Sequence, residues 1–327
     1  CTIPSIRGKM RSKPLDRIVA EARELVLDGA FELNLIGQDT TSFGDDIGYG
    51  AGMPGMLRAV SGAVAEAGGG AGWVRLMYAY PSNFSDAMID AMAELAGEGR
   101  VLPYIDMPLQ HASDRVLAAM RRNVTSAQQR RVIERLRAKI PGMAIRTTFI
   151  SGFPGETEED HRELLAFVED IGFEALGVFE YSREPGTVAG TLETDPALAV
   201  SPEDKARRRG EVMALQQRLA FARAAKLAAA FDEHRPEATG ERLQVLIDEP
   251  TGASGVATAG VGKGGRLYRG RTRFQAPMID AVTYVQSSDK LAPGELVSCV
   301  VVGSDGYDLI ARPVSDLQKR IGLRILR

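Results

Sequence analysis

Helical and strand-like stretches alternate between residues 14 and 181. Over 14–28, apolar residues recur on one helical face, with Pro14 in the first turn and Gly29 at the stop. Strand-like stretches lie at 31–37, 72–80, 101–107, 143–150 and 173–181, and further helices are predicted at 85–96, 113–121, 126–139 and Glu158–Asp170. Such alternation predicts parallel strands joined by crossover helices, and therefore an α/β fold.

Each of the five strand-like stretches ends in polar or glycine-rich residues. These ends are the segments GQDT, YPSNF, DMPLQH, SGFPGE and EYSREPGT. A single segment of this kind is usually only a loop rich in turn-forming residues. In a parallel barrel, however, the C-terminal ends of the strands carry the chemistry. Five such ends in succession, with Gln, Asp, His, Arg and Glu side chains, therefore favour one common site.

The pattern changes after a long helical stretch at 202–234, whose Arg207, Arg208 and Arg209 are expected to form a solvated face. Short alternating strands with Gly and Asp-Gly turns then follow, at 242–249, 253–262, 266–274, 280–286 and 295–314. They predict a small all-β barrel. From Gly240 onward the chain has 12 basic and 9 acidic residues, which leaves 28 basic and 34 acidic residues in the preceding part.

Basic and aromatic residues interleave within this predicted barrel. They are Lys263, Arg266, Tyr268, Arg269, Arg271, Arg273 and Phe274. This pattern is compatible with nucleic-acid binding and equally with an ordinary charged hairpin.

Composition limits the remaining classes of protein. Hydrophobic residues make up 44% of the 327 positions and charged residues 25%, which is typical of a soluble globular protein. No apolar stretch approaches the ~20 residues that a membrane span needs, and no signal peptide is visible. The net charge of −3 gives no reason to expect a large nucleic-acid footprint. Two cysteines form no disulfide framework, so a reducing, cytoplasmic setting is expected.

The two cysteines lie far apart, at Cys1 and Cys299. Cys299 falls in the predicted barrel and is expected to be a buried core residue. Cys1 precedes the first helix, and the barrel interpretation requires one more strand before it. At the end of such a strand Cys1 could be a nucleophile, a metal ligand or a small buried residue. One thiolate alone does not hold an iron–sulfur cluster, which needs about three or four.

Six segments carry a resemblance to a known family. In this order, CTIPSIRGKMRSKP, IGQDTTSFG, YAYPSNF, YIDMPLQHASDRVLAAMRR, RTTFISGFPGETEEDHRELLAFV and VFEYSREPGTVA resemble the radical S-adenosylmethionine methylthiotransferases. DMPLQHASDRVL is similar to the branch that modifies a ribosomal protein (RimO type), whereas the tRNA branch (MiaB type) usually has a segment closer to HLPVQSGS. The C-terminal barrel resembles the TRAM domain. The resemblance covers essentially the whole chain.

The resemblance implies a fold and a set of domains. The expected fold is a partial (β/α) radical-SAM barrel at 1–236, a TRAM barrel at 240–312 and a C-terminal tail at 313–327. The family's cluster motif is Cys-x3-Cys-x2-Cys, and Cys1 with Pro4 matches its third cysteine. The first strand, the first two cluster cysteines and the family's N-terminal domain are expected upstream of Cys1. We therefore expect this chain alone to be inactive.

The resemblance also implies cofactors and roles. The intact parent would use two 4Fe-4S clusters and S-adenosylmethionine, which yields a 5′-deoxyadenosyl radical. Its residues implied by the resemblance are Cys1 as cluster ligand, Gln38 and Asp39 at the cofactor amine, Arg146 at its carboxylate, Gln110 at its ribose, and Ser151, Gly152 and Phe179 around its adenine. His111 falls where the two branches differ and is a candidate catalytic residue near the acceptor.

Structural alternatives accompany three of these assignments. Arg146 could instead pair with a carboxylate inside the barrel, Asp39 could cap the following turn, and His111 could fix a loop. His161 lies in an amphipathic helix and is expected at the surface.

The implied reaction is methylthiolation of the β-carbon of an aspartate in small-subunit ribosomal protein twelve. The implied partners are that protein or the small ribosomal subunit, an electron donor, and RNA through the TRAM barrel, with no membrane. One alternative is a methylthiotransferase acting on a modified adenosine of tRNA. A second is a fragment that only binds ribosomal protein or RNA through its barrel.

Overall fold

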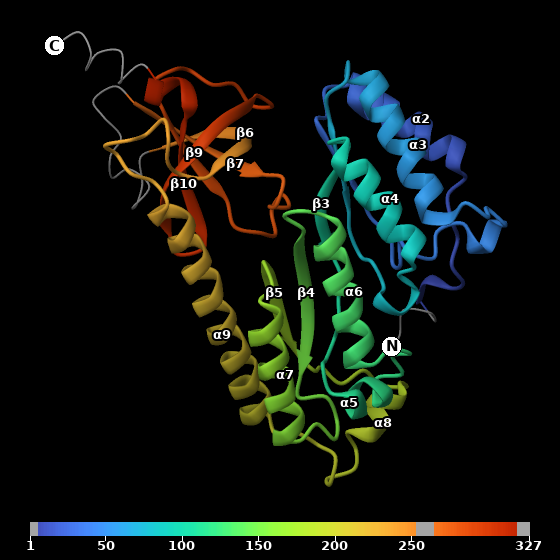
Figure 1. Cartoon of the computed structure of the whole chain (residues 1–327). Coiled ribbons are helices and arrows are strands. Elements are labelled where there is room, and N and C mark those ends of the chain that lie inside the picture. Colours follow the sequence, from blue (N-terminus) through green and yellow to red (C-terminus); the bar gives the residue numbers. More distant parts are fainter. Residues whose placement is uncertain (1–5, 253–264, 319–327) are drawn as a thin grey trace. The chain divides into compact units, whose positions relative to one another are not determined.

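The computed structural model describes residues 6–252 and 265–318 (Figure 1). The chain divides into two compact units, Cys1–Gln216 and Gln217–Arg327. The division falls inside one long helix. No helix in the described ranges combines the length and the apolar character that crossing a membrane requires.

The first unit contains a five-stranded sheet in the order β1-β2-β3-β4-β5, and neighbouring strands are parallel throughout. Its strands are β1 (Glu32–Leu35), β2 (Trp73–Leu76), β3 (Val101–Asp106), β4 (Ala144–Ser151) and β5 (Ala175–Glu180). The parallel arrangement that the alternation predicted is therefore confirmed.

Helices join these strands, and Figure 1 shows α2, α3, α4 and α6 following one another beside the sheet. The helical elements are α2 (Leu15–Leu27), η1 (Asp45–Ile47), α3 (Gly52–Ala67), η2 (Pro81–Asn83), α4 (Asp86–Gly97), α5 (Asp114–Ala119), α6 (Ser126–Lys139), α7 (Glu158–Ile171), α8 (Val188–Leu192) and α9 (Pro202–Ala229).

Local signals fix the starts of two of these helices. Thr125 and Gln128 form a capping box at α6, and Thr157 and Asp160 form one at α7. Each box satisfies backbone N–H groups that a helix end otherwise leaves unpaired. Gly172, in a left-handed conformation, ends α7.

The two faces of the sheet differ in chemistry. On β4, Phe149 packs edge-on against Phe167 of α7 and Phe173, with ring centroids 6.5 and 5.9 Å away. Arg146 lies on the opposite face of the same strand and pairs with Asp106 of β3. Because side chains alternate along a strand, the face away from the helices is the one that can hold polar groups.

Several elements differ from the predictions, and the short elements η1, η2 and α8 had no predicted counterpart. Helix α3 was not predicted, because its sequence contains Pro54 and several glycines. Burial compensates for this poor propensity, since Met53 and Leu57 are fully buried. Strand β2 ends at Leu76 rather than at residue 80. Helix α9 ends at Ala229 rather than at residue 234.

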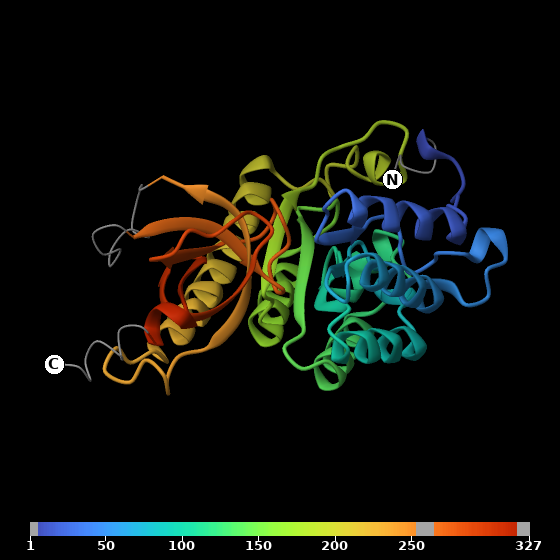
Figure 2. The same ribbon diagram turned by 90° about the horizontal axis from the view of Figure 1, so that it is seen from above.

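The second unit contains a closed barrel in the order β10-β8-β7-β6-β9, drawn in orange to red in Figure 2. Its strands are β6 (Arg242–Thr251), β7 (Arg266–Thr272), β8 (Thr283–Ser287), β9 (Leu296–Asp305) and β10 (Asp308–Pro313). Val245, Val285 and Cys299 belong to its core. Both the small barrel and the buried Cys299 are thus confirmed. A further strand expected at 253–262 lies outside the described residues.

The end of α9 belongs to this second unit. Ala224 packs in one buried cluster with Val301 and Leu309 of the barrel. Phe221 contacts Tyr307 edge-on, with ring centroids 4.9 Å apart. The helix therefore contributes to the core of the barrel unit.

Substitutions at two glycines test how closely the barrel strands pack. A Cβ at Gly270 of β7 would lie 2.5 Å from the Leu246 carbonyl oxygen, whereas at Gly177 of β5 it would meet nothing within 4 Å. We expect Gly270→Ala to lower the free energy of unfolding of the barrel unit by about 2 kcal/mol, as overpacking does. Gly177→Ala is the control, with an expected change between zero and about +1 kcal/mol. Denaturant unfolding of both variants measures this, and equal effects would contradict the close approach.

Candidate functional site

The segments after the strands are joined to one another by hydrogen bonds. After β1, the Thr40 N–H donates at 3.1 Å to the carbonyl of Tyr78, which follows β2. The Ala79 N–H donates to the Asp106 carbonyl of β3 at 2.9 Å. At the end of β4, the Ser151 carbonyl accepts from the Tyr181 N–H at 2.8 Å. The predicted strand ends therefore form one continuous edge, and this edge is the candidate site.

At the end of β1, Gln38 is exposed and Asp39 is half-buried. The Asp39 carboxylate accepts from the Thr41 N–H at 2.9 Å and from the Ser42 hydroxyl at 2.7 Å. The Asn83 side chain also donates to it, at 3.2 Å. Asp39 thus caps the turn, which was the structural alternative for it. Gln38 keeps its side chain at the surface.

Gln110 occupies a conformation that few residues adopt. Its φ is +72°, in the left-handed region. The Gln110 N–H donates to the Thr148 carbonyl at 2.9 Å, and its carbonyl accepts from the Ile150 N–H at 2.8 Å. These bonds extend the pairing of β3 and β4 by one step and fix the backbone of the half-buried Gln110 at the strand ends.

Arg146 is engaged by a buried acid. Its Nη1 lies 2.7 Å from Oδ1 of Asp106, whose side chain is 1% exposed. The other Asp106 oxygen, Oδ2, is buried and has no hydrogen-bond partner within the described residues. The ion pair that stood as the alternative for Arg146 is therefore present, and Asp106 has one buried acceptor unsatisfied.

The segment after β4 is covered by the start of α9. The Ser151 hydroxyl donates to the Lys205 carbonyl at 3.2 Å. A Cβ at Gly152, whose φ is +74°, would lie 2.2 Å from Cγ of Lys205. Ser151 and Gly152 are buried, whereas Phe179 of β5 is 67% exposed. Of these three predicted adenine contacts, only Phe179 presents its side chain to solvent.

His111 is completely buried behind the strand ends. Its Nδ1 accepts from the Ser113 N–H at 3.0 Å, so the neutral ring carries its proton on Nε2. That Nε2 has no hydrogen-bond partner among the described residues and lies 3.8 Å from Oε2 of Glu156. Burial lowers the pKa of His111 to about 4. His111 is thus neutral at physiological pH.

Glu156 lies at the centre of the same buried cluster. Its Oε2 accepts from the N–H groups of Gly152 and Phe153 at 2.6 and 3.1 Å. Its Oε1 lies 3.1 Å from Nη1 of Arg208, which is 5% exposed. Burial raises the pKa of Glu156 against the opposing effect of Arg208. The cluster therefore ties the β4 end to α9.

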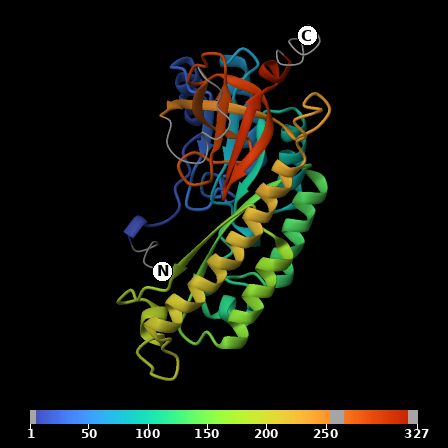
Figure 3. The ribbon, with the colours of Figure 1, turned by 90° about the vertical axis from the view of Figure 1, so that its left-hand side faces the viewer.

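Two predictions about helices α7 and α9 were wrong. Figure 3 shows the two helices side by side. Arg208 was expected to be solvated but is buried against Glu156. His161 was expected at the surface but is 1% exposed, and its Nε2 lies 2.7 Å from Oε2 of Glu211. Their partners lie about 50 residues away along the chain, so helical periodicity alone could not reveal these contacts.

Arg122 is a candidate that the sequence analysis missed. Its guanidinium lies over the Tyr80 ring, 4.5 Å from the centroid, at the segment that follows β2. Its Nη1 is buried without a hydrogen-bond partner in the described ranges. Burial lowers the pKa of Arg122, with no acid contributing. A partly buried cation without an acidic partner is costly, so Arg122 is suited to an anionic group of a ligand. The segment MRRNV alone could not distinguish it from Arg121.

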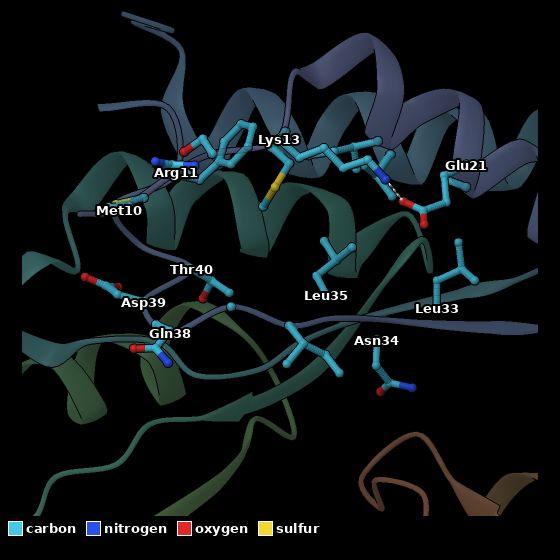
Figure 4. Close-up of a pocket in the computed structure, with 18 of the residues that line it drawn as sticks. Met10, Arg11, Lys13, Glu21, Leu33, Asn34, Leu35, Gln38, Asp39 and Thr40 are labelled. Atoms are coloured by element: carbon cyan, nitrogen blue, oxygen red, sulfur yellow. Dashed lines mark hydrogen bonds and ion pairs between the residues drawn. The ribbon is translucent and has the colours of Figure 1, made fainter. Parts of the chain in front are cut away.

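A cavity of about 1020 Å³ lies beside β1 (Figure 4). Leu33 and Leu35 point into it from β1, whereas Asn34 points the other way. Apolar residues of α2 and α3 complete its walls, and basic residues of the segment 7–13 line its rim. Gln38 and Asp39 also line it, so the cavity reaches the candidate site.

Metal-binding side chains are sparse in the described ranges. No group of three or more His, Cys, Asp or Glu suited to a metal ion occurs there. Cys1 lies outside the described residues. Burial raises the pKa of the Cys299 thiol to about 12, so this buried thiol is protonated at physiological pH.

Two family models match the chain. Residues 1–168 match the Radical SAM superfamily, and residues 239–314 match the TRAM domain. These matches agree with the parallel sheet and with the small barrel, respectively.

Curated relatives match over most of the chain. It is 41% identical over 318 residues to ribosomal protein uS12 methylthiotransferase RimO of Anaeromyxobacter sp. (strain K), covering 96% of this chain and 60% of that protein. It is 39% identical over 314 residues to the protein of the same name from Geotalea uraniireducens (strain Rf4), covering 96% of this chain and 62% of that protein. The chain thus spans about 60% of the length of the curated relatives it matches.

The buried His111 makes stability depend on pH. Its folded pKa of about 4 lies below its ordinary 6.5, so the stabilisation is present above pH 6.5 and is lost as pH falls toward 4. Full protonation would cost about 3 kcal/mol of unfolding free energy. We expect His111→Asn, which keeps an acceptor for Ser113, to flatten this dependence. Urea unfolding between pH 7 and 4 measures the difference, and parallel curves for both proteins would contradict the assignment.

Proposed function

The chain belongs to the radical SAM superfamily, and on that premise we propose that its parent protein is a methylthiotransferase that uses S-adenosylmethionine. The proposal rests mainly on the match of residues 1–168 to the superfamily. The same residues include most of a parallel sheet whose strand ends form one edge. The relatives named as uS12 methylthiotransferases supply the reaction class.

The strand ends fit the polar groups of S-adenosylmethionine. Arg122 has a buried N–H group without a hydrogen-bond partner in the described part of the chain, and Asp106 has a buried acceptor oxygen without one. A zwitterionic ligand can satisfy both groups. The bound cofactor and an iron–sulfur cluster would supply reductive cleavage and radical chemistry, which protein side chains do not provide. The chain's own residues bind and orient the cofactor and exclude water.

Individual roles follow from the geometry. We assign the cofactor carboxylate to Arg122, because Arg146 is already paired with Asp106. Gln38 is the exposed acceptor for the amine, while Asp39 shapes the turn that presents it. Gln110, held in a strained conformation, is proposed for the ribose.

The remaining candidates act at the other end of the edge. Phe179 offers an exposed ring for the adenine. Ser151 and Gly152 shape the β4 end, because the Gly152 N–H is already bonded to Glu156. His111 is proposed as a positioning residue behind that end, since it is buried and cannot reach an acceptor.

Cys1 is proposed as one ligand of the radical-generating 4Fe-4S cluster, with two further cysteines upstream. The cavity beside β1 supports a further strand at that edge in the parent protein.

A second cluster and an electron donor are proposed for the parent by the resemblance alone, and the cytoplasm is the proposed location. The division into a radical SAM part, a TRAM barrel and a tail, and the inactivity of this chain alone, remain part of the proposal.

The proposed acceptor is the β-carbon of an aspartate in ribosomal protein uS12, free or within the small ribosomal subunit. If the acceptor were an adenosine of tRNA, we would expect basic side chains without acidic partners on the surface of the TRAM barrel. Arg269 instead pairs with Glu249 at 2.9 Å, and Arg271 pairs with Asp248 at 3.0 Å. Arg273 lies over Phe274, and Lys263 lies outside the described residues. Two of the four described arginines of this surface are therefore paired with acids, which favours the protein acceptor.

Pull-down of the chain with purified uS12 and with tRNA separates these acceptors. Retention of uS12 supports the protein acceptor. Tight tRNA binding that weakens steeply with salt, without retention of uS12, would overturn it.

The assignment of Arg122 can be tested by cofactor binding. We expect Arg122→Gln to weaken S-adenosylmethionine binding at least about tenfold, because a charge-assisted hydrogen bond contributes about 1.5–3 kcal/mol. Arg121→Gln is the matched control, because Arg121 is the exposed neighbour. Saturation-transfer NMR titration measures both affinities. Equal affinities for the two variants would remove Arg122 from the site.

A further inference from the structure

Tyr78 has a backbone conformation that its residue type disfavours. It follows β2 with a φ of +56°, in the left-handed region. For a residue other than glycine, such a conformation costs on the order of 1–3 kcal/mol. Such strain persists only where the surrounding structure imposes it, and it is frequent at functional sites.

Neighbouring strand ends impose this conformation from both sides. The Thr40 hydroxyl donates to the carbonyls of Met77 and Tyr78 at 2.8 and 3.2 Å. The Ala79 N–H is held by the Asp106 carbonyl. Met77 and Ala79 are 6% and 0% exposed. The backbone on both sides of Tyr78 is therefore anchored.

The ring that this backbone presents contributes little to the fold. Tyr78 is 44% exposed. Within the described part of the chain, its hydroxyl has no hydrogen bond and its ring has no aromatic or cation–π partner. The exposed ring of Tyr78 is thus attached to a strained and anchored backbone segment.

That place lies between two proposed cofactor contacts. Thr40, which holds Tyr78, follows Gln38 after β1, and Asp106, which holds Ala79, ends β3. The ring therefore belongs to the same edge as the cofactor groups but comes from a strand, β2, that has no assigned cofactor contact.

We propose that Tyr78 is a docking contact for the polypeptide acceptor at the mouth of the site. A fixed tyrosine offers a large amphipathic contact surface at low entropic cost, and tyrosine is enriched among residues that dominate protein interfaces. Residues 1–239 carry 28 basic and 34 acidic residues, a balance that disfavours a polynucleotide as the partner of this part of the chain. This proposal rests on the proposed function.

Three variants of the full chain separate a binding role from a structural one. Tyr78→Asn removes the ring and suits the left-handed conformation, Tyr78→Gly does the same without a side chain, and Tyr78→Phe keeps the ring. If the ring serves binding, the first two variants are at least as stable as the unaltered chain, because strain is relieved and few contacts are lost. Thermal unfolding measures this.

Binding is measured with three probes: S-adenosylmethionine, purified uS12, and a single-stranded RNA of mixed sequence. We expect Tyr78→Asn to weaken uS12 binding at least about tenfold, as loss of an interface anchor does, while S-adenosylmethionine binding changes less than about twofold. Tyr78→Phe should retain most of the uS12 affinity.

The possible failures are distinct. Lower stability of both ring-deleted variants would make Tyr78 structural and overturn the proposal. Unchanged uS12 binding, or loss of RNA binding instead, would overturn it while leaving the proposed function in place. If the unaltered chain binds neither S-adenosylmethionine nor uS12, the proposed function fails and this proposal fails with it.

Discussion

The common direction of the five strands is the constraint from which the site follows. Because β1 to β5 are parallel, every strand ends at the same edge, and the following segments bond to one another. Residues as far apart in the sequence as Gln38 and Phe179 are thereby placed on one edge. No single segment builds this site, so its groups are positioned by the sheet and not by their loops.

Buried charge secures one end of that edge. Glu156 is fixed by two backbone N–H groups and by Arg208, and His111 lies beside it in neutral form. Burying a charged acid is costly, and here hydrogen bonds and an ion pair offset that cost. The cluster therefore makes the position of the β4 end depend on the first turns of α9.

The repeating features of the fold could be predicted from the sequence, whereas the contact partners of individual side chains could not. Periodicity and turn residues predicted the five strands, the capped helices α6 and α7, and the barrel, because these depend on local pattern. Helix α3 was missed because its glycine-rich sequence is stabilised by burial, which is a tertiary effect. The pairing of Arg146 with Asp106 and the isolation of Arg122 Nη1 likewise depend on contacts across strands and loops.

The contact between Gly152 and Lys205 limits how the chain can vary. The Lys205 side chain is held by Glu193 and its carbonyl accepts from the Ser151 hydroxyl, so the connection from β5 to α9 acts as a spacer of fixed reach. An insertion or deletion in that connection that shifts α9 along its axis would bring a different side chain over Gly152. The length of a surface connection is thus constrained by the interior of the site, and length changes there should be rarer than changes of residue type.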